Sequence, residues 1–111
     1  MAKKEDNLST TINQTLKNLL QERGIDPFKI VVFGSYARGT EREESDIDIV
    51  VVSKDFRNKS IFERVSLTTG IGRQMVHQFK KPIDLLFYSD KEWEEGNSIV
   101  IHAARQEGVD L

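Results

Sequence analysis

The sequence predicts a small α+β domain of two layers, in which a mixed β-sheet of three or more strands packs against helices. Three observations support this fold class. Segments with apolar residues at helical spacing alternate with short β-branched segments, the resulting order is α-β-α-β-α-β-α, and the connections between the expected strands differ in length. At 111 residues the chain can bury one modest core, so we expect a single domain over residues 1–111.

The composition argues against several classes of function. The formal net charge is −2, which gives no general attraction to nucleic acid or to an anionic membrane. The scattered lysine and arginine residues leave open whether a local basic rim forms. The chain has no cysteine, and therefore no disulfide, thiolate nucleophile or thiolate zinc site. Its first residues lack the apolar run of a secretory signal, and no segment predicts a membrane span. We therefore expect a cytoplasmic protein.

The first half of the chain predicts a helix and two strands. Leucine and isoleucine recur at helical spacing from about Asn7 to Arg23, and Gly24 is expected to end this helix. The segment Phe28–Phe33 (FKIVVF) is short and β-branched, which predicts the first strand. A helical turn (SYARGT) and a charged loop (EREES) then lead to the second strand, Asp46–Val52 (DIDIVVV).

The second half predicts two longer helices around a third strand. A Ser-x-x-Glu capping box at Ser60 begins a helix that continues to about Phe79. The third strand is Pro82–Tyr88, and a second capping box at Ser89 opens a short helix (DKEWEE). A last helix begins at Asn97 or Ser98 and ends at Gly108. The residues expected to face the core from the two longer helices are Ile61, Val65, Thr68, Gly72, Met75 and Phe79, and then Ile99, Val100, Ala103 and Ala104.

The lengths of the connections predict how the strands pair. The short connection between the first two strands suits antiparallel pairing, and the helical crossover from Val52 to Pro82 suits parallel pairing of the second and third. These pairings bring the end of the first strand and the starts of the other two to one edge of the sheet. The residues expected to converge there are Gly34, Ser35, Asp46, Asp48 and Asp84.

The aspartates at this edge predict a metal site. Asp46 and Asp48 lie two apart on a strand and so share a face, and close carboxylates raise each other's proton affinity unless a cation lies between them. Asp84 interrupts a segment that otherwise predicts a buried strand, where an unpaired carboxylate is costly. Carboxylate oxygens suit Mg²⁺ or Mn²⁺, and two such ions about 3.5–4 Å apart can hold the attacking and leaving oxygens of a phosphoryl transfer.

The turn after the first strand predicts a phosphate site. Gly34 allows a ligand to approach the backbone N–H groups, and the Ser35 hydroxyl can donate to a phosphate oxygen. Arg38, one turn later, can reach the same oxygens. Taken singly, each feature has an ordinary explanation as a turn, a strand start or a salt-bridged aspartate. Their coincidence at one predicted edge favours a chemical site.

The segment GSYARG, followed by SDID and a later strand PIDLLF, resembles the nucleotidyltransferase superfamily that includes DNA polymerase β. The short length and the ending EGVDL are most similar to the minimal nucleotidyltransferases, small bacterial and archaeal proteins often encoded beside an all-helical HEPN partner. The resemblance runs from about Leu8 to the C-terminus and implies the nucleotidyltransferase fold. Arg38 lies on an extension (ARG) that is common in minimal members.

The resemblance also implies a role for each matching position. Gly34 and Ser35 match the residues that hold the nucleotide triphosphate. Asp46 and Asp48 match the pair that ligates both metal ions. Asp84 matches the third carboxylate, which ligates the catalytic metal and is a candidate to take the proton from the attacking hydroxyl.

The activity implied by the resemblance is transfer of a nucleoside monophosphate, by expectation AMP from ATP, onto a hydroxyl, with two Mg²⁺ ions and release of pyrophosphate. The expected acceptor is a helical HEPN-type toxin partner, with a homo-oligomer as a further source of acceptor surface. Two alternatives stay open. One is an antitoxin-like binding module that neutralises a partner by contact, and the other is a free-standing small-molecule adenylyltransferase. The sequence leaves open the preferred base, the acceptor and the oligomeric state.

Overall fold

The computed structural model describes residues 4–33, 46–96 and 98–110 of the chain. The elements in order are α1 (Lys4–Glu22), β1 (Lys29–Phe33), β2 (Ile47–Val52), the 3₁₀ helix η1 (Lys54–Phe56), α3 (Ile61–Leu67), α4 (Ile71–Phe79), β3 (Ile83–Tyr88), α5 (Asp90–Glu95), α6 (Ile99–Glu107) and β4 (Val109–Asp110). The predicted helical turn SYARGT and loop EREES lie outside the described residues. Among the helices that are described, none combines the length and the apolar character that crossing a membrane requires.

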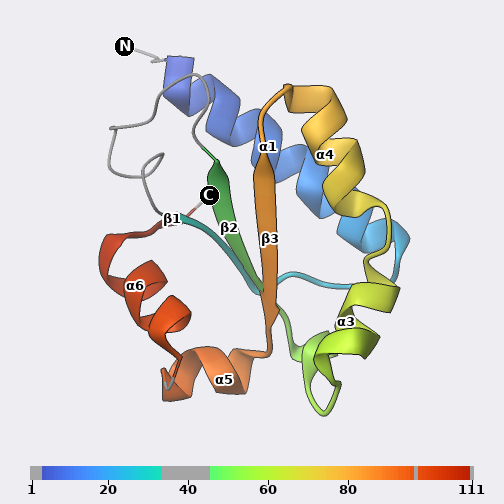
Figure 1. Ribbon diagram of the computed structural model, residues 1–111, viewed down its shortest axis with the longest axis vertical. Coiled ribbons are helices and arrows are strands. Elements are labelled where there is room, and N and C mark those ends of the chain that lie inside the picture. The colour runs from blue at the N-terminus through green and yellow to red at the C-terminus, as the bar shows by residue number, and fades with distance from the viewer. Residues whose placement is uncertain (1–3, 34–45, 97, 111) are drawn as a thin grey trace.

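The described strands form one mixed sheet in the order β3-β2-β1-β4. β1 runs antiparallel to β2, and β2 runs parallel to β3, which confirms both predicted pairings. β4 pairs antiparallel with β1. The sequence does not predict this strand, because two residues have no periodicity to detect. β2 and β3 lie side by side at the centre of the molecule (Figure 1).

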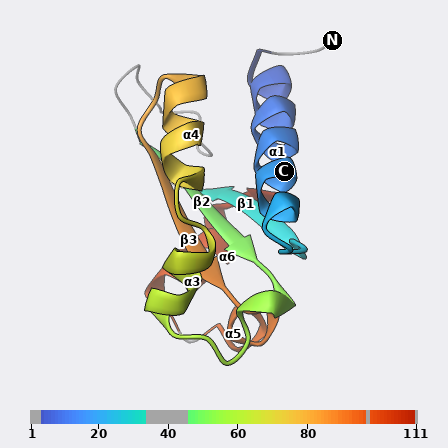
Figure 2. The same ribbon diagram turned by 90° about the vertical axis from the view of Figure 1, so that its right-hand side faces the viewer.

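Helices cover both faces of the sheet, which confirms a mixed sheet packed against helices but gives three layers where the sequence predicted two. Side chains alternate along β2, so Ile47, Ile49 and Val51 belong to the core beneath α1 and α4, and Val50 and Val52 belong to the core beneath α5 and α6. Figure 2 shows α1 and α4 in front of the sheet and α6 behind it. β2, which carries the predicted site residue Asp48, is therefore buried along most of its length on both faces.

The predicted helix over residues 60–79 is two helices in the structure. A capping box begins α3 as predicted. Gly70 then adopts a left-handed backbone with φ of 88° and begins α4, a conformation that glycine enters without steric cost. Because the chain turns here, the predicted single core face is wrong. Ile61 and Val65 on α3 are exposed, whereas Met75 on α4 is fully buried.

The last helix faces the core differently from the prediction. α6 begins after Ser98 and ends at Gly108, as expected. Ala104 is buried as expected, but Ile99 is exposed, and Ile101 takes the buried position. An apolar run at the start of a nine-residue helix leaves its inward face ambiguous by one position.

Gly108 lies where the chain passes from α6 into β4. Its N–H donates to the carbonyl oxygen of Ala104 at 2.8 Å. A Cβ atom at Gly108 would overlap both that oxygen and Cγ1 of Val31 on β1. Glycine is therefore needed for α6 to approach β1 this closely.

The substitution Gly108→Ala is expected to lower the free energy of unfolding by about 1–3 kcal/mol, because α6 or β1 must shift. Gly72→Ala is the matched control. It lies inside α4, where a Cβ would meet only Cδ1 of Leu85, at an ordinary 3.9 Å, so it should be neutral or stabilising by up to about 1 kcal/mol. Urea unfolding curves measure both effects. Equal midpoints for the two variants would contradict the requirement for glycine at residue 108.

Candidate functional site

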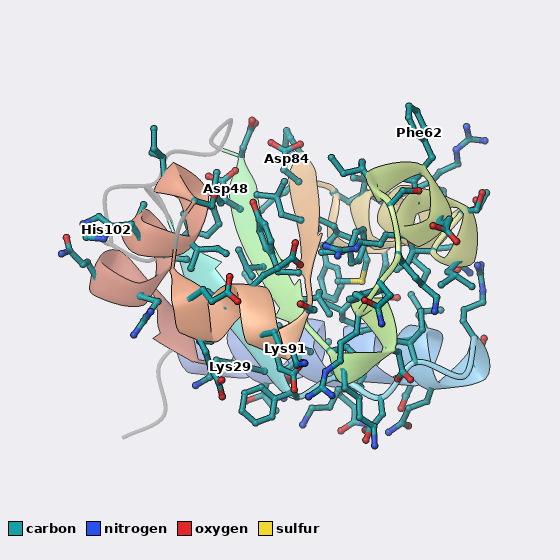
Figure 3. All side chains as sticks on the ribbon, turned by 90° about the horizontal axis from the view of Figure 1, so that it is seen from below. Lys29, Asp48, Phe62, Asp84, Lys91 and His102 are labelled. Atoms are coloured by element: carbon teal, nitrogen blue, oxygen red, sulfur yellow. The ribbon has the colours of Figure 1, made fainter. Side chains whose placement is uncertain are left out.

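The parallel register of β2 and β3 makes Asp48 and Asp84 direct neighbours. Neighbouring strands lie about 4.8 Å apart, so the two carboxylates start from adjacent backbone positions. Asp48 is partly buried, and Asp84 is exposed. Figure 3 shows both side chains at the same end of their strands.

Both carboxylates lie on the sheet face that α5 and α6 partly cover. Val50 on β2 and Leu86 on β3 belong to the core on this face. Residues two apart on a strand share a face, so Asp48 lies on the side of Val50, and Asp84 lies on the side of Leu86. The two carboxylates therefore project in the same direction.

β1 finishes at the same edge of the sheet, that is, at the end where β2 and β3 begin. Phe33, the last residue of β1, pairs with Asp48 in the antiparallel register. The chain therefore leaves β1 beside the carboxylates. The predicted phosphate-binding residues Gly34, Ser35 and Arg38 lie outside the described residues, and their roles stay predictions.

Asp46 precedes β2 and is exposed. It is close enough to Asp48 to contribute to the raised pKa of that carboxyl group. Within residues 4–33, 46–96 and 98–110, no group of three or more acidic or histidine side chains is arranged to hold a metal ion. The predicted aspartates thus reach one edge as a neighbouring pair, Asp48 and Asp84, with Asp46 beside it.

The predicted burial of Asp84 is wrong. β3 is an edge strand, and Asp84 is exposed near its start. The apolar segment PIDLLFY does not reveal this, because an edge strand with helices beside it has the same composition as a central one. The carboxylate that loses part of its contact with water is Asp48.

The electrostatic environment disfavours a negative charge on Asp48. Burial raises the pKa of the Asp48 carboxyl group above its usual value, and the carboxylates of Asp84 and Asp46 raise it further. In the described part of the chain, no lysine or arginine forms a salt bridge with any of the three aspartates. Lys29 and Lys91 lie toward the opposite end of the strands (Figure 3).

These residues fit a divalent metal ion. Mg²⁺ is usually bound by one or two carboxylates together with waters and substrate phosphates. Asp48 and Asp84 supply such a pair, and Asp46 adds negative charge beside it. A cation between these carboxylates would offset their repulsion, which no described basic side chain does.

Known proteins resemble this chain in sequence and in fold. Residues 12–106 match the family model described as a nucleotidyltransferase domain. A protein of Methanocaldococcus jannaschii named a "putative protein adenylyltransferase" is 39% identical over 75 residues, which are 68% of this chain and 50% of that protein. The chain therefore spans about half the length of this curated relative.

Two solved structures show the same fold. One is described as a toxin–antitoxin with AMP-PNP, and it aligns with a TM-score of 0.62 and 22% identity over 87% of this chain and 69% of that chain. The other is described as a "putative minimal nucleotidyltransferase", and it aligns with a TM-score of 0.59 and 21% identity over 96% of this chain and 95% of that chain.

The substitution Asp48→Asn is expected to stabilise the metal-free protein at neutral pH, because it removes a charge that burial and two carboxylates oppose. The folded protein binds this proton more tightly than the unfolded chain, so the wild type loses stability as pH rises from the unfolded pKa of Asp48 to its folded pKa. Removing the repulsion should raise Tm at pH 7 by about 2–4 °C.

Thermal unfolding in EDTA between pH 3.5 and 7 measures this effect. The Tm difference between the Asp48→Asn variant and the wild type should grow as pH rises. Glu22→Gln, an exposed carboxylate at the end of α1, is the control and should leave Tm unchanged. A Tm difference for Asp48→Asn that does not change with pH would contradict the electrostatic explanation.

Proposed function

The chain belongs to the nucleotidyltransferase domain family, and on this basis we propose that it transfers AMP from ATP to a hydroxyl group. The observation that carries the proposal is the neighbouring pair Asp48 and Asp84, on the edge of the sheet where β1 also ends. In the proposal, the triphosphate lies on the β1 side, held by Gly34 and Ser35 with Arg38. These three assignments come from the sequence.

In the proposed reaction, the acceptor oxygen attacks the α-phosphorus of ATP. A phosphorus–oxygen bond to the acceptor forms, the bond from the α-phosphorus to the bridging oxygen breaks, and pyrophosphate leaves. In the proposal, Asp84 accepts the hydroxyl proton, and its exposure on the edge strand supports this role. Two Mg²⁺ ions on Asp46, Asp48 and Asp84 would neutralise phosphate charge when bound. The protein then contributes position and electrostatics, and no protein nucleophile is needed.

We propose a protein as the acceptor. The Methanocaldococcus jannaschii relative is named a "putative protein adenylyltransferase", and a structure described as a toxin–antitoxin shares the fold. These observations support an antitoxin-like enzyme that modifies a partner protein. A HEPN-type helical toxin is the proposed partner, with a second copy of this chain as a further source of acceptor surface.

Asp48→Asn and Asp84→Asn are each expected to lower AMP transfer by at least about 100-fold. Loss of a group that only orients a metal ligand lowers activity by about 10- to 100-fold, and loss of the ligand itself should cost at least as much. The assay uses the chain co-expressed with the product of the neighbouring gene, Mg²⁺ and α-labelled ATP. Glu22→Gln is the control for a lost remote carboxylate and should keep full activity. Full activity in both aspartate variants would remove these residues from the site.

Removal of divalent metal is expected to abolish transfer reversibly, since the phosphates and the aspartates would then repel each other. EDTA should stop incorporation of the label, and added Mg²⁺ or Mn²⁺ should restore it. Transfer that persists in EDTA would contradict the metal site.

The intact mass of the co-expressed partner distinguishes the alternatives. Added AMP on the partner with the wild type, but not with the Asp84→Asn variant, is expected for a protein adenylyltransferase. A stable complex with no added AMP in either case would instead show a binding module. Turnover of a small hydroxyl compound with no protein partner would show a free-standing enzyme.

A further inference from the structure

The face of β3 connects the candidate site to a pocket at the other end of the strand. Asp84, Leu86 and Tyr88 lie on the same face, because they are two residues apart. Leu86 and Tyr88 are only partly buried there. β3 is also the edge strand farthest from the end of β1, where the proposed triphosphate lies. Because the proposed triphosphate lies on the β1 side of the carboxylate pair, we expect the acceptor to lie on the β3 side.

The pocket lies where β3 meets α5 and α6. It has a volume of about 320 Å³, and its lining residues are Tyr88, Glu92, Glu95, Ser98 and Ile101. Figure 1 shows β3 leading into α5, with α6 on the same side of the sheet. The pocket thus lies on the face that carries Asp48 and Asp84.

The chemistry of the lining suits a cation. Glu92 accepts hydrogen bonds from the Ser89 N–H at 2.7 Å and from Arg64 at 2.8 Å, so its charge is already partnered. Glu95 is exposed, and within the described residues no ion pair or hydrogen bond engages its carboxylate. The Tyr88 ring adds an aromatic surface, and an aromatic ring beside a carboxylate is a favourable environment for an ammonium or guanidinium group.

Two carboxylates of α5 favour a basic side chain over a phosphate group at this pocket. Asp90 pairs with Arg57 and Glu92 pairs with Arg64, and Arg105 donates to the backbone carbonyl oxygens of Trp93 and Glu94. Among the described residues, Glu94 and Glu95 are the α5 carboxylates without an ion pair, and Glu95 lines the pocket. Glu95 would repel a phosphate group and attract an ammonium or guanidinium group.

We infer that this pocket binds a lysine or arginine side chain of the acceptor protein while the acceptor hydroxyl lies at Asp84. This inference rests on the proposed function. Asp84 and Tyr88 are four residues apart on one strand, which spans about 13 Å. An extended acceptor segment covers that distance in about four residues. The preferred acceptor therefore has a basic residue about four positions from the modified hydroxyl.

Synthetic peptides of glycine, alanine and glutamine, with one tyrosine, test the inference. A lysine stands four residues before or four residues after the tyrosine. Matched peptides carry glutamate at those positions, or lysine directly beside the tyrosine. Binding is measured without nucleotide by NMR titration of the labelled protein, and transfer is measured separately with α-labelled ATP and Mg²⁺.

Peptides with lysine at the four-residue spacing are expected to shift the amide signals of Tyr88, Glu95 and Ser98, and to bind about 5- to 10-fold more tightly than the glutamate peptides. Glu95→Gln should reduce this preference, and Glu95→Lys should reverse it. Glu94→Lys is the matched control. It makes the same charge change one residue away, outside the pocket, and should keep the preference for lysine.

The inference is overturned if no peptide binds with a preference for lysine, if the adjacent lysine serves equally well, or if Glu94→Lys and Glu95→Lys act alike. Failure of the proposed function gives a different result. Lysine-dependent binding without transfer to any peptide or partner would retain the pocket and reject the activity. Transfer that ignores peptide charge would retain the activity and reject the pocket.

Discussion

The register between β2 and β3 is the constraint on which the candidate site depends. Hydrogen bonds from the Ile47 N–H to the Pro82 carbonyl at 2.8 Å and from the Ser53 N–H to the Tyr88 carbonyl at 3.0 Å mark its two ends. A slip of one residue would reverse every side chain of β3 between the two cores. Such a slip would move Asp84 to the α1–α4 face, away from Asp48. The packing of β3 on both faces therefore maintains the pairing of the carboxylates.

The same strand is held at its far end by a buried arginine. Arg64 of α3 donates to the carbonyl oxygen of Phe87 at 2.9 Å and to Glu92 of α5 at 2.8 Å. Glu92 is also part of the capping box that begins α5. One side chain thus ties α3, β3 and α5 together, so the wall of the inferred pocket has a fixed position relative to the strand that carries Asp84. Glu95, one turn further along α5, is not held in this way and stays available to a ligand.

Acidic side chains lie at both ends of the strands, and each end has a different ligand chemistry. Acidic residues meet at the start of β2 and β3, where the neighbouring carboxylates raise the pKa of Asp48. At the other end, Glu95 and Tyr88 line one pocket on the same face. The first arrangement suits a metal ion with phosphates, and the second suits an organic cation. One acceptor molecule could therefore place its hydroxyl group at the carboxylate pair and its basic group in the pocket.

The sequence by itself determined the features that depend on neighbouring residues along the chain. The capping boxes at Ser60 and Ser89, the end of α6 at Gly108 and the pairing of the first three strands follow from local hydrogen bonding and connection lengths. Only the tertiary structure decided that Asp84 is exposed, that α4 begins anew at Gly70, and that Tyr88 and Glu95 line one pocket. The physical reason is that burial depends on which distant element covers a surface. A hydrophobic pattern reports that a segment can be buried, but it does not report where the sheet ends.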